Sequence, residues 1–163
     1  MKIFLRALLF VALSLWLGAE FFFPFVAATV FTTLHPDTHT AGQIVGHLLS
    51  SLHTLGLISS MVIVVALAAA GSKGFYRPIP ALLPIGIVLL MAALTLHSQR
   101  VITPAMERDR LAAGGSVDAA SETNPARRDF KRQHNNSERV EGLILLLGLV
   151  AMVCLANEET ALA

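Results

Sequence analysis

Ionisable side chains lie inside or beside the long apolar stretches of this sequence, where they are costly unless they have a partner or a function. Glu20 is the only charged residue between Arg6 and Phe31. His53 lies within the second apolar stretch, and Glu141 lies at the start of the last one. We therefore predict an inward-facing polar cluster near one membrane face, made of Glu20, His53, Arg100, His134, Ser137 and Glu141.

Three interpretations of this cluster are open. Imidazole groups suit copper, iron and zinc, so His53, His97 and His134 are candidate ligands in a haem- or copper-binding oxidoreductase or metal-handling protein. Intramembrane acids also mark proton and solute paths, which would make the protein a small-solute or proton transporter using Glu20 and His53. The third interpretation is structural, with interfacial histidines and one His–Glu or Arg–Glu pair. We favour the third, and no residue is assigned a catalytic role.

The spacing of the histidines argues against a dedicated metal site. His47 and His53 are six positions apart, which separates them by about 120° around a helix. The sequence has no HExxH motif, and its single cysteine, Cys154, cannot form a cysteine cluster or an internal disulfide. No metal ligand is assigned, and haem or copper stays an alternative.

The composition favours an integral membrane protein. The chain is 55% hydrophobic and 14% charged, whereas a soluble domain has about 25% charged residues. A net charge of +1 leaves no general basic footprint for nucleic acid. We therefore expect the lipid bilayer to be its main surrounding, and the cell (inner) membrane to be its location.

Four stretches are long and apolar enough to cross a bilayer, which takes about 20 residues in a helix. They cover residues 7–31, 44–70, 79–102 and 138–156. We find no β alternation long enough for a barrel. The prediction is an all-α, integral membrane four-helix bundle that forms a single membrane domain over residues 1–163.

The long polar connection between spans three and four is predicted to be partly helical. Residues 104–113 could form a short helix, ended by the two glycines that follow. Asn124 and Pro125 are typical of a helix start, and a helix beginning there could continue unbroken into the fourth span. Pro84 should bend the third helix or delay its start.

Four spans place the first and third connections on one side of the membrane, together with all the histidines. The Lys and Arg residues are more numerous on that side, which favours a cytoplasmic location. The basic residues before the first span favour the opposite orientation. Along span two, small residues and His53 share one face, which should point inward.

Several motifs stand out along the chain, at Trp16 to Phe22, Phe25 to Ala28, Val30, Phe31, Ala41, Gly42, Leu52, His53, Gly56, Pro104, Met106, Arg108, Phe130, Arg132, His134 and Ser137. These motifs resemble the transmembrane protein 205-like family, also described as domain of unknown function 4149. The resemblance covers most of the chain and implies four helices, a single membrane domain and an inward role for Glu20, His53 and His134. It implies no settled activity. A more distant likeness to the copper-resistance D membrane proteins implies copper handling by analogy of fold.

The sequence departs from the family pattern at two positions. Glu141 stands where many members carry asparagine, and Ala28 stands where many carry proline. Besides the lipid bilayer, the partners that a chain of this composition is compatible with are further copies of itself or another membrane protein.

Overall fold

The chain folds entirely into helices joined by short or irregular connections. The computed structural model describes the backbone of residues 1–75 and 78–160 and the side chains of residues 1–75 and 82–157. Over these residues it contains no strand, which confirms the predicted all-α class. The elements are α1 (Lys2–Thr33), α2 (Thr38–Ser72), α3 (Pro78–His97), the π-helical turn η1 (Ser98–Ile102), α4 (Thr103–Ala112) and α5 (Pro125–Thr160).

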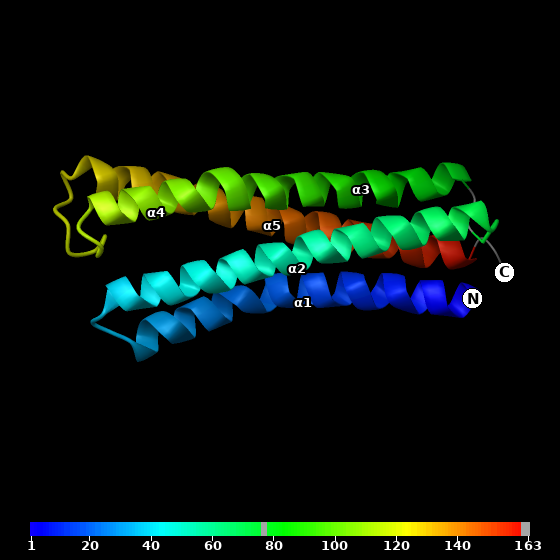
Figure 1. The fold of residues 1–163 in the computed structure, drawn as a ribbon, viewed down its shortest axis with the longest axis horizontal. Helices are drawn as coiled ribbons and strands as arrows, with labels where there is room; N and C mark the ends of the chain where they lie inside the picture. Colours follow the sequence, from blue (N-terminus) through cyan, green and yellow to red (C-terminus); the bar gives the residue numbers. More distant parts are fainter. Residues whose placement is uncertain (76–77, 161–163) are drawn as a thin grey trace.

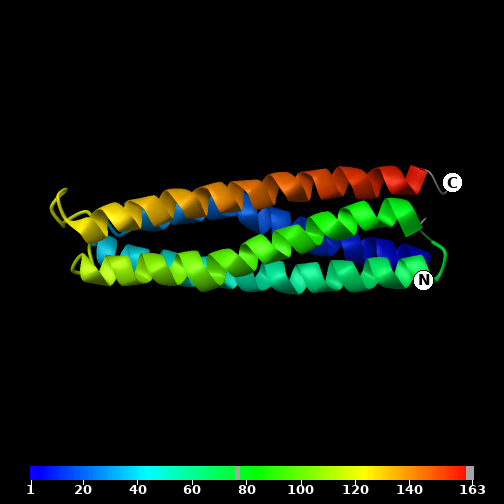
Figure 2. The same cartoon turned by 90° about the horizontal axis from the view of Figure 1, so that it is seen from above.

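The long helices run alternately up and down and form a four-helix bundle (Figures 1 and 2). Helix α1 packs on α2 and α5, and α3 packs on the same two helices, so the four form a closed ring. The α1–α2 and α4–α5 connections lie at one end, which we call the loop end. The start of α1 and the end of α5 lie at the other, which we call the terminal end (Figure 1). Four helices among the described residues are long and apolar enough to cross a membrane, as predicted.

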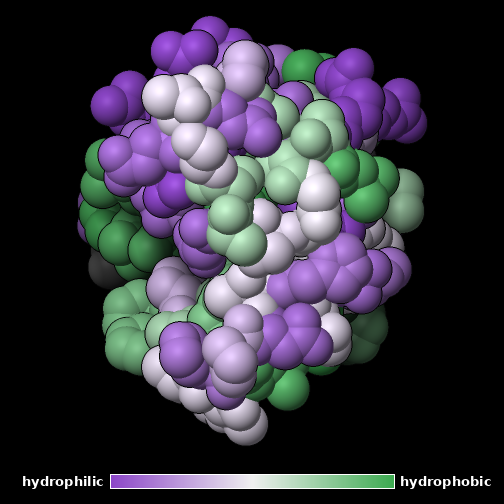
Figure 3. Space-filling view, turned by 90° about the vertical axis from the view of Figure 1, so that its left-hand side faces the viewer, coloured by the Kyte–Doolittle hydropathy of each residue, from purple (hydrophilic) through white to green (hydrophobic). Residues whose placement is uncertain are grey.

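The outer surface of the bundle is apolar, as expected for helices that face lipid rather than water. Exposed aromatic and aliphatic side chains occur on all four long helices, and include Phe21, Phe22, Met61, Leu90, Leu146 and Val153. Hydrophilic side chains gather instead at the loop end, mainly over the ends of α4 and α5 (Figure 3). This distribution fits a bundle whose middle lies in the bilayer.

Helices α3 and α4 are joined by η1 without a break, a continuity that the sequence did not predict. The N–H of Thr103 bonds to the carbonyl of Ser98, five residues earlier. Pro104 lacks an N–H and its ring crowds the carbonyl four residues before it, so the wider π turn accommodates the proline. The predicted delay at Pro84 is wrong: α3 begins at Pro78 and contains Pro84.

The predicted helix boundaries at the loop end are confirmed. The side chain of Asn124 accepts a hydrogen bond from the N–H of Ala126 at 2.9 Å, and α5 then runs unbroken into the fourth span. Gly114 and Gly115 follow α4 with φ of +91° and +88°, which glycine adopts without strain. Asp37 caps α2, and hydrogen bonds from Thr40 hold the pKa of its carboxyl below the usual value.

Candidate functional site

The carboxylate of Glu141 is the meeting point of three elements of the bundle. Its Oε1 lies 2.9 Å from Nε2 of His53 on α2. The hydroxyl of Ser98, in η1, donates to the same oxygen at 2.7 Å. The side chain of His53 is fully buried and that of Glu141 is 15% exposed. The π turn therefore brings Ser98 against a histidine–carboxylate pair inside the bundle.

The histidine and the carboxylate each keep one buried polar atom without a protein partner. These atoms are Nδ1 of His53 and Oε2 of Glu141, and among the described residues Thr103 Oγ1 shares this condition. Buried polar atoms without protein partners are costly and uncommon, and each is accounted for by a bound water or ion, by strain or by a functional role. The protein therefore provides a hydrogen-bond partner for only one of the two polar atoms on each of these two side chains.

Glu20 forms the deeper part of the same site. It is 5% exposed, and its Oε1 accepts a hydrogen bond from Nε1 of Trp16, one turn earlier on α1, at 3.1 Å. The indole lies against Gly56 of α2, which is on the same face of that helix as His53. Below, the site cluster means Trp16, Glu20, His53, Ser98 and Glu141.

Ser98→Ala should destabilise the protein by about 1 kcal/mol, because Glu141 loses a buried hydroxyl donor. The matched control is Ser60→Ala. The Ser60 hydroxyl is also buried but bonds only to a carbonyl of its own helix, that of Leu57, so this change should be close to neutral. Detergent-solubilised protein unfolded by sodium dodecyl sulfate gives both values. Equal effects of the two changes would show that the Ser98–Glu141 bond does not stabilise the fold.

The structure does not bring all the predicted residues together. Arg100 is exposed, although its neighbours Ser98 and Ile102 in η1 are buried. His134 is half exposed, stacks on Phe130 with ring centroids 6.0 Å apart and pairs with Glu138 at 3.2 Å. Both contacts of His134 are with residues of α5 itself. On the face of α5 that leads from His134 to Glu141, the side chains first become buried at Ser137.

The candidate metal ligands are also dispersed. His97 and His134 are exposed, whereas His53 is inside the bundle. Within the described part of the chain, no group of three histidine, cysteine, aspartate or glutamate side chains is arranged to hold a metal ion. His53 reaches only one other ionisable ligand by a direct contact, Glu141.

Sequence reasoning missed Trp16 and Ser98. The i, i+4 spacing of Trp16 and Glu20 was an available signal, because such residues meet on a helix surface. Ser98 had no such signal, since its direction depends on the π turn.

A second polar cluster closes the loop end and was also missed. Arg110 is 5% exposed and pairs with Glu107 at 2.7 Å. Its Nη1 lies 2.8 Å from Nδ1 of His39 and donates to the carbonyl of Gly115. These contacts tie the start of α2 to the connection after α4.

The bundle between the site cluster and the terminal end is filled mainly with apolar side chains. Three buried hydroxyl residues, Ser59, Ser60 and Thr95, also lie on this side of His53 and Ser98 along their helices. The fully buried side chains of this apolar half include Leu9, Leu13, Ile63, Leu67, Met91 and Leu155.

The comparison with family models identifies the chain. The model described as Domain of unknown function (DUF4149) matches residues 11–113, which include α2, α3, η1, α4 and most of α1. The chain belongs to the DUF4149 family. The match contains four of the five residues of the site cluster in this DUF4149 protein, and Glu141 lies beyond its end. No curated protein and no solved structure matches the chain significantly.

Proposed function

We propose that this DUF4149 protein is a membrane transporter for protons or a small solute, in which the site cluster takes up and releases a proton. The observation that carries the proposal is the buried pair of His53 and Glu141, 2.9 Å apart, with an unpartnered polar atom on each residue. Chains of acidic residues and histidines inside a membrane bundle are the usual parts of proton relays.

The chemistry of the pair supports proton exchange. An imidazole and a carboxyl group at hydrogen-bond distance can hold one proton between them, on either partner. The unpartnered Nδ1 of His53 and Oε2 of Glu141 are each able to bond to a further donor or acceptor. Glu20 provides a second carboxyl group deeper in the bundle, with Trp16 as its donor.

The apolar half of the bundle implies that the helices move during transport. This conformation is closed toward the terminal end by packed side chains such as Leu13, Ile63 and Met91. A π turn inside an α-helix is frequently found at a functional site. We propose η1, which carries Ser98, as the point where α3 and α4 shift relative to α5.

Proton flux into liposomes tests the proposal. Purified protein reconstituted with an enclosed pH-sensitive dye should acidify the lumen faster than empty vesicles. Glu141→Gln and Glu20→Gln should lower that rate at least about tenfold, because an amide cannot exchange a proton. Glu138→Gln is the matched control, since Glu138 is 66% exposed on α5 and lies outside the cluster. Absence of flux under imposed pH and voltage gradients, or equal flux from all variants, would overturn the proposal.

A haem- or copper-binding role has less support than transport. The distant likeness to copper-resistance D proteins favours it by analogy, but His97 and His134 lie on the surface, apart from His53. We also propose, from the resemblance, that the protein groups with the transmembrane protein 205-like proteins and forms a single domain over residues 1–163. From its composition we propose that it resides in the cell (inner) membrane. A homo-oligomer or a membrane protein partner is compatible with its apolar exterior.

A further inference from the structure

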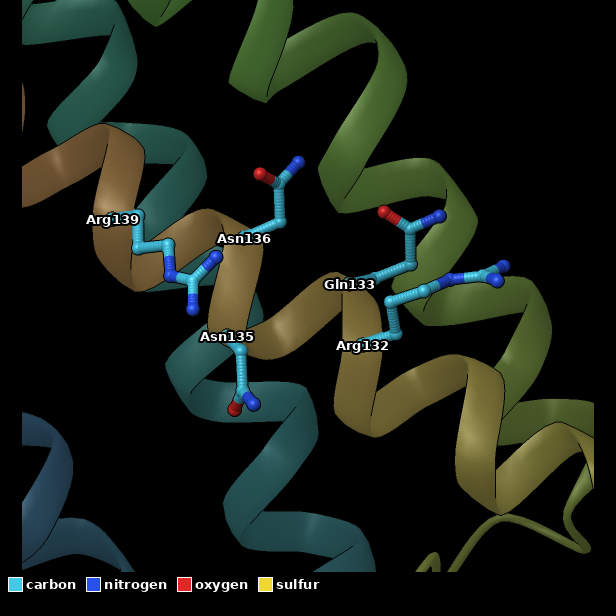
Figure 4. A pocket seen from close by; sticks show the side chains of 5 residues that line it. All are labelled: Arg132, Gln133, Asn135, Asn136 and Arg139. Atoms are coloured by element: carbon cyan, nitrogen blue, oxygen red, sulfur yellow. The ribbon is translucent and has the colours of Figure 1, made fainter.

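A shallow depression lies on the outer face of α5, separate from the site cluster. It has a volume of about 430 Å³ and is lined by Arg132, Gln133, Asn135, Asn136 and Arg139. Figure 4 shows these side chains projecting from successive turns of the helix, with the Arg139 guanidinium directed along the helix and that of Arg132 toward the loop end. No carboxylate lines it.

The lining is suited to a phosphate group. Two guanidinium groups offer charged donors that match phosphate geometry, and three side-chain amides add further N–H donors. From Pro125 to Arg139, α5 carries five basic residues and two acidic ones. Arg132 pairs with Asp129 at 3.2 Å, but both side chains are at least half exposed. Such a pair is weak, so a bound anion can compete with Asp129 for the guanidinium of Arg132.

The depression lies at the depth of lipid headgroups. The apolar run of α5 begins at Val140, directly after Arg139. Glu141 lies within this run, but its carboxylate points into the bundle toward His53. A helix rises about 1.5 Å per residue, so Arg132 lies about 10 Å further from the hydrocarbon. The headgroup layer is about 5–8 Å thick on each side. The lining residues therefore span that layer and its outer edge.

We propose that this depression binds the phosphate of an anionic phospholipid headgroup. Charge complementarity and depth together select the occupant: the donors require an anion, and the bilayer supplies phosphate at this level. Asn135 and Asn136 lie between the two arginines along α5 and would bond to the remaining phosphate or glycerol oxygens. The inference does not depend on transport by the site cluster.

Lipid titration of the full chain in zwitterionic detergent tests this site. Native mass spectrometry should show phosphatidylglycerol bound at least about tenfold more tightly than phosphatidylcholine with the same acyl chains. The double variant Arg132→Gln, Arg139→Gln should lose most of that preference. The matched control is Lys2→Gln, Lys73→Gln, which removes the same charge from exposed positions at the terminal end and should keep it.

Each other outcome overturns the proposal. Equal loss in the two double variants would indicate attraction by net charge alone. Full retention in the arginine variant, whose thermal unfolding should match that of the unmodified protein, would place the lipid elsewhere. Inorganic phosphate binding at the arginines without any preference for phosphatidylglycerol would assign the site to a free anion, and binding of neither would leave no anion site.

Discussion

His53→Ala should destabilise the protein by about 2–3 kcal/mol and abolish proton flux. The substitution leaves the largely buried carboxylate of Glu141 without its imidazole partner, and an uncompensated buried charge is strongly destabilising. It also opens a cavity, because the His53 side chain is fully buried. Unfolding by sodium dodecyl sulfate measures the stability, and the liposome assay measures the flux.

Two further variants separate stability from proton exchange. His53→Gln retains an N–H donor toward Glu141, so it should recover part of the stability while flux stays absent. In a double-mutant cycle of His53→Ala with Glu141→Ala, the two effects should fall short of additivity by about 1–2 kcal/mol, because the residues share one interaction. Additive effects would contradict the pair as a coupled unit. Normal flux in His53→Gln would remove the imidazole from the proposed mechanism.

Gly56→Ala should destabilise the bundle by about 1–3 kcal/mol through overpacking. A methyl group at this position would lie 2.5 Å from Nε1 and 2.7 Å from Cε2 of Trp16. The indole is rigid and fully buried, so it cannot move aside without losing contact with the core and its hydrogen bond to Glu20. Because Trp16 is the only tryptophan, intrinsic fluorescence reports its displacement directly.

Gly46→Ala is the matched control on the same helix. A Cβ there meets nothing within 4 Å, and alanine favours a helix over glycine by about 1 kcal/mol. The control should therefore be neutral or slightly stabilising and leave the tryptophan emission unchanged. A neutral Gly56→Ala with unshifted emission would contradict the close approach of α1 and α2 at this point.

The architecture was predictable because it follows from local and compositional properties of the chain. Four apolar stretches of sufficient length require four helices, since a backbone in lipid must satisfy its own hydrogen bonds. Their alternation sets which connections share an end. The start of α5 was predictable from Asn124 and Pro125, because capping depends on side chains next to the helix terminus.

The site was only partly predictable, because contacts between helices depend on rotation and register. The sequence identified Glu20, His53 and Glu141 as polar groups that need shelter. It also grouped them with Arg100 and His134, whose side chains the structure leaves exposed toward the loop end of the bundle. The depth of a residue in the membrane can be counted along its helix. Whether its side chain points into the bundle depends on which face of that helix the neighbouring helices cover.

The sequence by itself determined that this is a four-helix membrane protein with costly polar groups toward one end. Only the tertiary structure decided which groups meet. The π turn rotates Ser98 toward Glu141, and His53 reaches the same oxygen from α2. Pro104 favours an irregular turn, because its ring crowds the carbonyl four residues earlier, but the packing of the helices decides which neighbour the side chain of Ser98 meets. Burial and pairing arise from these long-range contacts, which local sequence patterns do not encode.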